Sequence, residues 1–452
     1  MTKNEIIELE ITALSSDGNG VGRADGMAVF VPFTAPGDRA LVKIVKVQKS
    51  FAFGILHELL SPGPARVEPD CPVFGRCGGC ALRQISYPAE LAAKTAFVED
   101  AFRRIGGFSI SAAPCLPSPQ MDRYRNKAQY PLGADAEGRV FAGFFAPRSH
   151  RVIPCADCLL QPQALGEVAN LLCALFTEYR LPVYDEQRRT GLLRHLYLRR
   201  ARDGELSVCI VANGRRLPHE KELVRRLTQQ RPEVKTVALN INTKNTNVIL
   251  GGETRVLFGT GVLEDTLCGV PVALAPSSFY QVNTLGAEQL YGVARQLASP
   301  GPGDLLLDLY CGAGTIGLSM AKEVGQLVGV EIVLSAVESA KLAAQKMGAG
   351  NARFFCADAG EAAARLASEG LRPTLVVLDP PRRGCDEKTL NAVLSMAPDR
   401  IVMVSCNAAT AARDVKFLAA GGYSLQQLRP VDMFPRTKHV EAVCLLSKLN
   451  TK

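Results

Sequence analysis

Cys406 follows the apolar run IVMVS at 401–405 and is followed directly by Asn407. An apolar run of this length is typical of a buried strand, so the cysteine is expected where a strand ends. A thiol in this position is compatible with three roles: a small packed hydrophobe, a metal ligand or a nucleophile. Other chemistry-bearing residues of the chain are needed to decide among them.

A glycine-rich turn, LDLYCGAGTIG at 307–317, lies between an apolar run and a predicted helix, which makes backbone N–H groups available to a ligand. Gly312 and Gly314 belong to this turn, and Glu331 ends the next predicted strand, near the ~20-residue offset at which an acid meets a ribose. Further acids recur at predicted strand ends, namely Asp308, Asp358 and Asp379. A dinucleotide fold is the alternative, but the turn lacks G-x-G-x-x-G. Acids at later strand ends fit a cationic sulfonium cofactor better, so the pattern favours S-adenosylmethionine.

The segment LDPPRRG at 378–384 places the Asp379 carboxylate and two prolines at a strand end, which fixes the exit of the chain beside a ligand. An Asp-Pro turn that simply closes a strand is the alternative, and the nearby cofactor motifs favour a functional role. Arg382 and Arg383 then meet RNA phosphate or remain solvated.

Cys406 is expected in the same sheet as these motifs, so its thiol should reach the same cleft. C5 of a pyrimidine is a poor nucleophile toward a sulfonium methyl group, but a thiolate that adds at C6 converts the ring to an enolate that is nucleophilic at C5. This mechanism needs a base to remove the C5 proton. Glu441 in HVEAVCLL is the first candidate and His439 the second.

The elements around these motifs predict a multidomain α/β protein. Residues 1–60 alternate short β-like runs with turns, which indicates a small OB-like antiparallel β-barrel, and SPGPAR at 61–66 is a linker. Residues 67–270 form a mixed α+β domain. Residues 271–452 show the regular strand and helix alternation of a doubly wound, Rossmann-like sheet, with ligands at the carboxyl ends of its strands.

The central region begins with CPVFGRCGGC at 71–80, which offers Cys71, Cys77 and Cys80. A fourth thiolate is available from Cys155 or Cys158, and the spacing alone does not distinguish zinc from an iron–sulfur cluster. The first gap of five residues is not that of a radical enzyme. We therefore expect a structural or RNA-orienting centre rather than a redox sensor.

Two segments interleave basic and aromatic residues: MDRYRNKAQYP at 121–131 and RRTGLLRHLYLRR at 188–200. Cations meet phosphates and aromatic faces stack unpaired bases, so these segments predict RNA binding, although an ordinary basic strand face is the alternative. The candidate residues are Arg123, Arg125, Lys127, Arg194 and His195. The net charge of +8 is compatible with an anionic partner.

The combination of LDLYCGAGTIG, GVE, LDPPRRG, SCNAAT, HVEAV and FYQVN at 279–283 resembles the RNA (uracil-5-)-methyltransferases, and the barrel-like start resembles the TRAM domain of members that modify 23S ribosomal RNA. The resemblance implies that Cys406 is the nucleophile and Glu441 the base. It also implies a [4Fe–4S] cluster with Cys158 as the fourth ligand. Residues that would hold the methyl donor or the uracil are Gln281, Tyr310, Glu331 and Asp379. The family usually has SCNP, so Ala408 in the proline position puts the rigidity of the thiol loop in question.

The implied reaction is conversion of a uridine of 23S ribosomal RNA to 5-methyluridine, with the target base flipped from its stack. Transfer RNA is the alternative substrate, against which the barrel and the cysteines argue. Cytosine-C5 methyltransferases usually carry Pro-Cys, and Ser405 stands there instead. A different class is a noncatalytic RNA-binding assembly or redox-sensing factor.

Acids at the start of the chain and the lack of an apolar run of ~18 residues predict a cytoplasmic protein without a membrane segment. No protein partner is implied, and a monomer is expected because the substrate is large.

Overall fold

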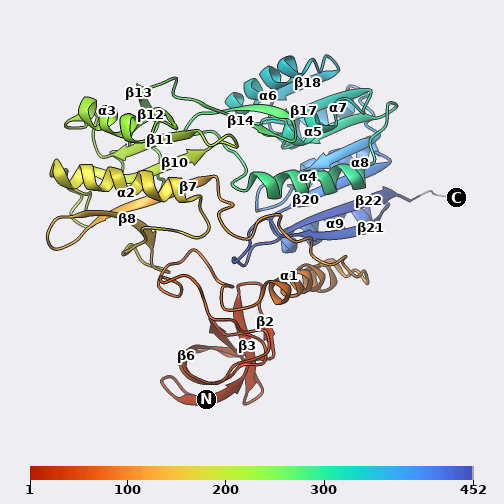
Figure 1. Ribbon diagram of the computed structural model, residues 1–452. Coiled ribbons are helices and arrows are strands. Elements are labelled where there is room, and N and C mark those ends of the chain that lie inside the picture. The colour runs from red at the N-terminus through yellow and green to blue at the C-terminus, as the bar shows by residue number, and fades with distance from the viewer. Residues whose placement is uncertain (450–452) are drawn as a thin grey trace.

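The computed structural model describes residues 1–449 and contains three sheets and one separate hairpin (Figure 1). The fold is the predicted one: an N-terminal β-domain, a central α+β region and a C-terminal doubly wound sheet. No helix in this described part of the chain is both long and apolar enough to cross a bilayer.

The N-terminal sheet has the order β1-β5-β6-β4-β3-β2. Its strands are β1 (Ile6–Glu10), β2 (Ala13–Leu14), β3 (Asn19–Ala24), β4 (Met27–Pro32), β5 (Arg39–Val47) and β6 (Phe51–Ser61). Alternate residues such as Val29, Val31, Val42 and Ile44 point inward and form its core. The pairing of β4 with β6 is parallel, whereas the sequence predicts an all-antiparallel barrel. The connection between these two strands contains β5, which supplies the length of chain that a parallel crossover needs.

The central sheet has the order β13-β12-β11-β10-β7-β8-β9. Its strands are β7 (Lys127–Ala134), β8 (Val140–Phe145), β9 (Val152–Pro154), β10 (Leu193–Arg200), β11 (Leu206–Ala212), β12 (Val234–Ile241) and β13 (Glu253–Phe258). The helices α2 (Gln163–Glu178) and α3 (Glu220–Gln230) cover one face, where Leu196 and Leu198 meet Leu172 and Leu223. The opposite face carries a smaller apolar cluster that includes Tyr197 and Cys209.

The C-terminal sheet has the order β18-β17-β16-β19-β20-β22-β21. Its strands are β16 (Leu305–Leu309), β17 (Gln326–Glu331), β18 (Ala352–Cys356), β19 (Leu375–Leu378), β20 (Arg400–Ser405), β21 (Tyr423–Val431) and β22 (Glu441–Lys448). The first five in spatial order are parallel, and β22 is antiparallel to both β20 and β21. Near-continuous apolar runs in these strands reflect burial on both faces.

Helices cover both faces of this sheet (Figure 1). They are α4 (Thr284–Ala298), α5 (Thr315–Met320), α6 (Leu334–Met347), α7 (Ala359–Ser368), α8 (Glu387–Met396) and α9 (Ala408–Ala420). The hairpin of β14 (Leu263–Leu267) and β15 (Val270–Leu274) packs against α4, α5 and α6. It includes residue 270, where the sequence predicts a domain boundary, so the whole hairpin packs with the C-terminal elements. The helix α1 (Tyr87–Ala101) continues into η1 (Phe102–Gly106) and packs on α9 and β21, although the sequence places it in the central region.

Candidate functional site

The order of the C-terminal sheet brings five predicted site residues to one edge. Leu309 pairs with Val330 and with Leu378, so Tyr310, Glu331 and Asp379 lie at the same level, where their strands end. Ser405 pairs with Ala442 on the antiparallel strand β22, which places Glu441 beside Cys406. This edge is the carboxyl end of the parallel strands, where ligands of such sheets bind.

Cys406 is half-buried among charged groups. Burial raises the pKa of its thiol, and the Glu441 and Asp379 carboxylates raise it further. The Arg382 side chain acts in the opposite direction, because it hydrogen bonds the thiol and carries a positive charge. The thiol therefore has a partner that stabilises its thiolate form, as nucleophilic attack requires.

Glu441 is buried, and burial together with the Asp379 carboxylate raises its pKa to about 8. His439, the second candidate base, lies 3.3 Å through Nδ1 from an Arg382 guanidinium nitrogen. Burial and the nearby cations lower the pKa of His439 to about 4, so its imidazole is neutral near pH 7. Glutamate and histidine side chains are both of the kind that act as general bases.

The turn after Cys406 is anchored although it lacks the proline of the family motif. Asn407 caps α9 by accepting a hydrogen bond from the N–H of Ala409 (3.1 Å). Its side-chain NH₂ donates to the Arg382 carbonyl (3.1 Å), and its backbone N–H donates to the Ser405 hydroxyl (3.2 Å). These bonds tie the thiol loop to the LDPPRRG segment.

The glycine turn has the backbone geometry that its composition predicts. Gly312 and Gly314 have φ values of 56° and 76°, in the left-handed region that favours glycine. A Cβ atom on Gly314 would lie 3.0 Å from the Phe354 ring. The N–H of Gly312 donates to the Glu331 carboxylate (3.1 Å), which joins the turn to the end of the next strand.

The remaining predicted cofactor residues lie around this turn. Tyr310 holds a left-handed φ of 65° and its hydroxyl lies 3.1 Å from that of Thr389. Gln281 donates from its side chain to the Tyr291 hydroxyl (3.3 Å). Asp358 caps α7 through one carboxylate oxygen.

Asp308, which is buried, and Asp379, which is half-buried, give this edge an acidic character. Burial raises the pKa of each to about 7, and Asp308 keeps one oxygen without a hydrogen-bond partner while the other accepts from the N–H of Gly317 (2.9 Å). Carboxyl groups with a high pKa and an unpaired oxygen fit a cationic ligand, because a nearby positive charge favours the ionised form. The residues present thus suit a sulfonium cofactor.

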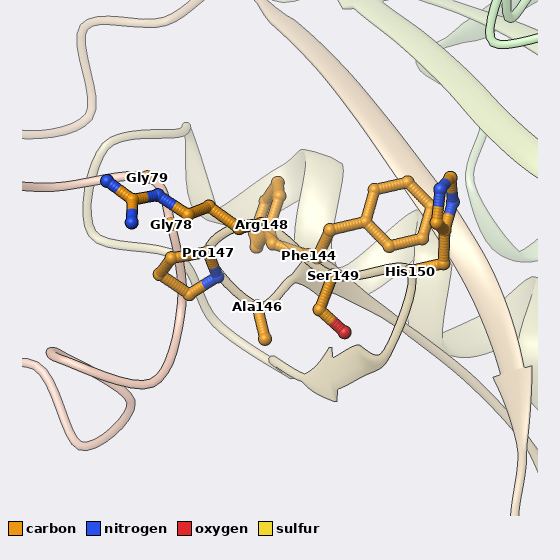
Figure 2. Close-up of a pocket in the computed structure, with 9 residues that line it drawn as sticks. Gly78, Gly79, Phe144, Ala146, Pro147, Arg148, Ser149 and His150 are labelled. Atoms are coloured by element: carbon orange, nitrogen blue, oxygen red, sulfur yellow. The ribbon is translucent and has the colours of Figure 1, made fainter.

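The central cysteines come together in space. Cys71, Cys77, Cys155 and Cys158 pack in one group with Val73. Burial raises the pKa of Cys80 to about 12, and the thiolates of Cys158 and Cys77 contribute to this shift, so Cys80 lies beside the group. Figure 2 shows the adjoining pocket, where Gly78 and Gly79 meet the segment 144–150, and the N–H of Gly78 donates to the Phe145 carbonyl (3.1 Å).

Within residues 1–449, no group of three or more His, Cys, Asp or Glu side chains is arranged to hold one metal ion.

Two of the five predicted RNA-binding residues have internal polar partners, and a third, His195, is buried. Arg123 pairs with Asp157 and donates to the carbonyls of Cys158 and Gln161 (both 3.1 Å), so it braces the cysteine group. Arg194 is buried and donates to carbonyls in the segment 242–244. Burial lowers the pKa of His195 to about 4, which leaves its ring neutral.

Arg125 and Lys127 differ, since both remain partly exposed and neither has a carboxylate partner among the described ion pairs. The sequence does not single out two further residues that the structure draws attention to. Arg199 lies next to Lys127, and Phe279, two residues before Gln281, is 80% exposed. Phe279 belongs to the FYQVN segment, but the sequence alone does not distinguish an exposed aromatic residue from a core residue. The distinction comes from its exposure in the structure.

Comparison with known families gives two matches. Residues 86–449 match the tRNA (Uracil-5-)-methyltransferase family, and residues 2–57 match the TRAM domain. Together they confirm the resemblance that the motifs indicate.

Full-length relatives agree with these matches. An uncharacterized RNA methyltransferase from Halalkalibacterium halodurans is 41% identical over 452 residues, which cover 100% of this chain and 98% of that protein. Another, from Clostridium tetani, is 37% identical over 451 residues, with 100% and 98% coverage.

Among solved structures, the Pyrococcus abyssi tRNA (uracil-54, C5)-methyltransferase in complex with S-adenosyl-L-homocysteine superposes with a TM-score of 0.76 at 25% identity. The match covers 97% of this chain and 100% of the other.

Proposed function

The chain belongs to the S-adenosylmethionine-dependent tRNA (uracil-5-)-methyltransferase family, and we propose that it methylates C5 of a uridine in 23S ribosomal RNA through a covalent adduct with Cys406. The observation that carries the proposal is the placement of Cys406 beside Glu441 on adjoining strands, at the sheet edge that also holds Asp379 and the glycine turn. A nucleophile and a base at one edge match a reaction that needs both.

The protein groups act in a defined order. The Cys406 thiolate, stabilised by Arg382, adds to C6 of the flipped uracil and pushes the ring electrons into an enolate. Bound S-adenosylmethionine supplies the methyl group that C5 of this enolate accepts. Glu441 then takes the C5 proton, the C5–C6 double bond re-forms, and the Cys406 sulfur leaves as thiolate.

The raised pKa makes the ionised Glu441 a stronger base than an exposed glutamate, and the positive charge of bound S-adenosylmethionine would favour that ionised form before the proton is taken. The exposed Phe279 ring beside Gln281 can stack an unpaired base of the RNA. Gln281 and the strand-end acids surround the space where donor and uracil meet.

Transfer RNA is a second candidate substrate, favoured by the likeness to the Pyrococcus abyssi enzyme, whose name states a tRNA target. The match with that structure covers 97% of this chain, so the matched region must include most of the N-terminal barrel. The barrel therefore does not argue against transfer RNA, contrary to the expectation from the sequence. The 23S assignment depends on the resemblance of the TRAM and cysteine regions to members of that specificity.

The substrate is tested by incubating the protein with methyl-labelled S-adenosylmethionine and, separately, unmodified 23S ribosomal RNA and transfer RNA, followed by nuclease mapping of the label. Label at C5 of a 23S uridine supports the proposal, and label only in transfer RNA replaces the substrate while keeping the chemistry. A Cys406→Ala variant should give no label with either RNA. Cys444→Ala is the matched control, since Cys444 is a buried cysteine of β22 that lies away from the strand-end edge.

We also propose that Cys71, Cys77, Cys80 and Cys158 hold a [4Fe–4S] cluster. The support is their grouping, together with Arg123, which braces the loop that carries Cys158. A cluster puts several iron and sulfide ions between its thiolates, so its ligands need not converge on one point as those of a single zinc ion do. Such a centre would fix the segments 71–80 and 155–158 against each other.

Protein purified without oxygen should be brown and contain iron and sulfide. A Cys158→Ser variant should lose most of the iron, whereas Cys173→Ser, in the core of α2, should keep it. Colourless protein that contains zinc would contradict the proposal.

A further inference from the structure

Three cationic side chains gather where β7 begins and β10 ends. Lys127 and Arg199 are direct partners in the antiparallel pairing of these strands, so their side chains lie on the same face. The Lys127 ammonium stands 5.7 Å from the centre of the Tyr197 ring, and the Arg199 guanidinium stands 5.3 Å from it. Arg125 is close enough to Lys127 for its charge to act on it. We call these three residues the basic triad.

The basic triad lacks an internal counter-charge. None of its members forms an ion pair with a carboxylate in the described part of the chain, and no carboxylate contributes to the pKa shift of Lys127 or Arg199, although the Tyr197 and Tyr280 hydroxyls act on Arg199. Arg199 is 2% exposed, yet its Nε and Nη1 atoms have no hydrogen-bond partner, and the same holds for Nε of Arg125. A buried guanidinium without an anion is costly, so an anionic ligand at this place would be strongly favoured.

Other buried arginines of the protein show the contrast. Arg83 is only 3% exposed, and its guanidinium forms ion pairs with both Asp70 and Asp122. Arg194 directs its guanidinium to the carbonyls of Asn242 and Lys244. Arg199 shares with Arg194 an Nε atom without a hydrogen-bond partner, and its Nη2 donates to the Tyr197 hydroxyl (2.7 Å), but it differs in having no carboxylate at ion-pair distance in the described part of the chain, whereas Arg194 has Glu186 at 4.0 Å.

The location of the basic triad, next to the segment 278–284, indicates which anion it would bind. Arg199 donates through Nη2 to the Ser278 carbonyl, and Asn126 donates to the Gln281 carbonyl (2.8 Å) and the Thr284 hydroxyl (2.9 Å). The triad thus adjoins the FYQVN segment, which connects β15 to α4 and carries Gln281, a predicted residue of the strand-end site. An RNA strand whose uridine enters the strand-end site would therefore pass close to the basic triad.

We propose that Arg125, Lys127 and Arg199 form a binding site for a backbone phosphate of the RNA substrate, next to the uridine that enters the strand-end site. This inference rests on the proposed function. Burial and the charges of Arg199 and Arg125 lower the pKa of Lys127 to about 8, a repulsion that a bound phosphate would relieve. Phosphate contacts of this kind set the register of a nucleic acid without reading its sequence.

The test measures binding separately from methyl transfer. The probe is a short, fluorescently labelled single-stranded RNA that contains uridine, and the dissociation constant is measured from roughly 50 to 200 mM KCl. Lys127→Met and Arg199→Met should each weaken binding roughly tenfold at the lowest salt. Each should also reduce the slope of log Kd against log salt by about 0.7, the value for one phosphate contact of a single strand.

Controls separate a lost contact from a lost fold. Arg199→Lys should restore part of the salt dependence because it keeps a cation. Lys221→Met should leave the slope unchanged, since Lys221 is exposed on α3, which packs on the other face of the sheet. Affinity for S-adenosylmethionine should match that of the wild type in every variant.

Unchanged slopes in both Lys127→Met and Arg199→Met, or an equal loss in Lys221→Met, would overturn the phosphate site. A wild-type protein that does not bind the probe would overturn it as well. Binding with the expected slopes but no methyl transfer to any RNA would support the site while refuting the proposed function.

Discussion

Cys406 and Glu441 lie side by side because Ser405 and Ala442 are partners in the antiparallel pairing of β20 and β22. If Glu441 removes the C5 proton, Glu441→Gln should still allow the thiol to add and the methyl group to be accepted, but elimination should stop. We expect a covalent protein–RNA adduct that carries the methyl label and survives a denaturing gel. The adduct should form with only one equivalent of label per protein.

The matched control is His439→Gln, which removes the other candidate base while Glu441 remains. This variant should turn over without accumulation of adduct. Adduct in the His439 variant and none in the Glu441 variant would reverse the two assignments.

The protonation of Glu441 should affect stability as well as activity. Its pKa is raised from 4.5 to about 8, so between these pH values the folded protein holds a proton that the unfolded chain has released. The free energy of unfolding therefore decreases as the pH rises through this range, by at most ~1.4 kcal/mol per unit from this group. Glu441→Gln should melt at nearly the wild-type temperature at pH 5 and at a higher temperature at pH 8.

The exposed Glu338 of α6 provides the comparison. Glu338→Gln should show no such pH-dependent gain over the wild type. An equal melting temperature of the Glu441 variant and the wild type at pH 8 would mean that Glu441 is not neutral in the fold.

Much of the strand-end site is predictable from the sequence because parallel strands end at one edge, so Tyr310, Glu331 and Asp379 have to be neighbours once the sheet is assigned. The antiparallel β22 is less accessible to such reasoning, since its position beside β20 depends on a long-range pairing. The basic segments show the opposite case. Arg194 and His195 look like surface residues by composition, but β10 is a central strand covered on both faces.

Ala408 allows a test of the thiol loop. It is the first residue of α9, where the N–H has no acceptor within the helix and proline is well tolerated, and Asn407 before it is extended (φ −140°, ψ 101°). Ala408→Pro should therefore raise stability by ~0.4–1 kcal/mol and leave the methylation rate unchanged, because hydrogen bonds of Asn407 already hold the loop. Thermal melting and initial rates measure both.

Ala409→Pro is the matched control one residue later. The N–H of Ala409 donates to the Asn407 side chain, so this variant should lose the cap and be destabilised by ~0.5–2 kcal/mol. Destabilisation by Ala408→Pro instead would show that the turn needs freedom at that residue.

Lys94 joins α1 to the segment that leads into β22. Its ammonium donates to Glu90 and Asp432 (both 2.7 Å) and to the Phe434 carbonyl (3.1 Å), and all three charged side chains are fully buried. Lys94→Met should lower the free energy of unfolding by ~3–5 kcal/mol, because it leaves two buried carboxylates without this cation. Lys341→Met, which removes an exposed lysine paired with Glu338 (3.0 Å), should change it by no more than ~1 kcal/mol.

Adding Asp432→Asn to Lys94→Met should recover part of the lost stability, since the substitution removes one of the two uncompensated charges. The residues are 338 positions apart in the chain, so this coupling reports directly on the docking of α1 against the segment 432–437. If the double variant is no more stable than Lys94→Met alone, the cost lies in the lost packing of the lysine stem rather than in charge. Chemical denaturation of the wild type, Lys94→Met, Asp432→Asn and the double variant distinguishes these results.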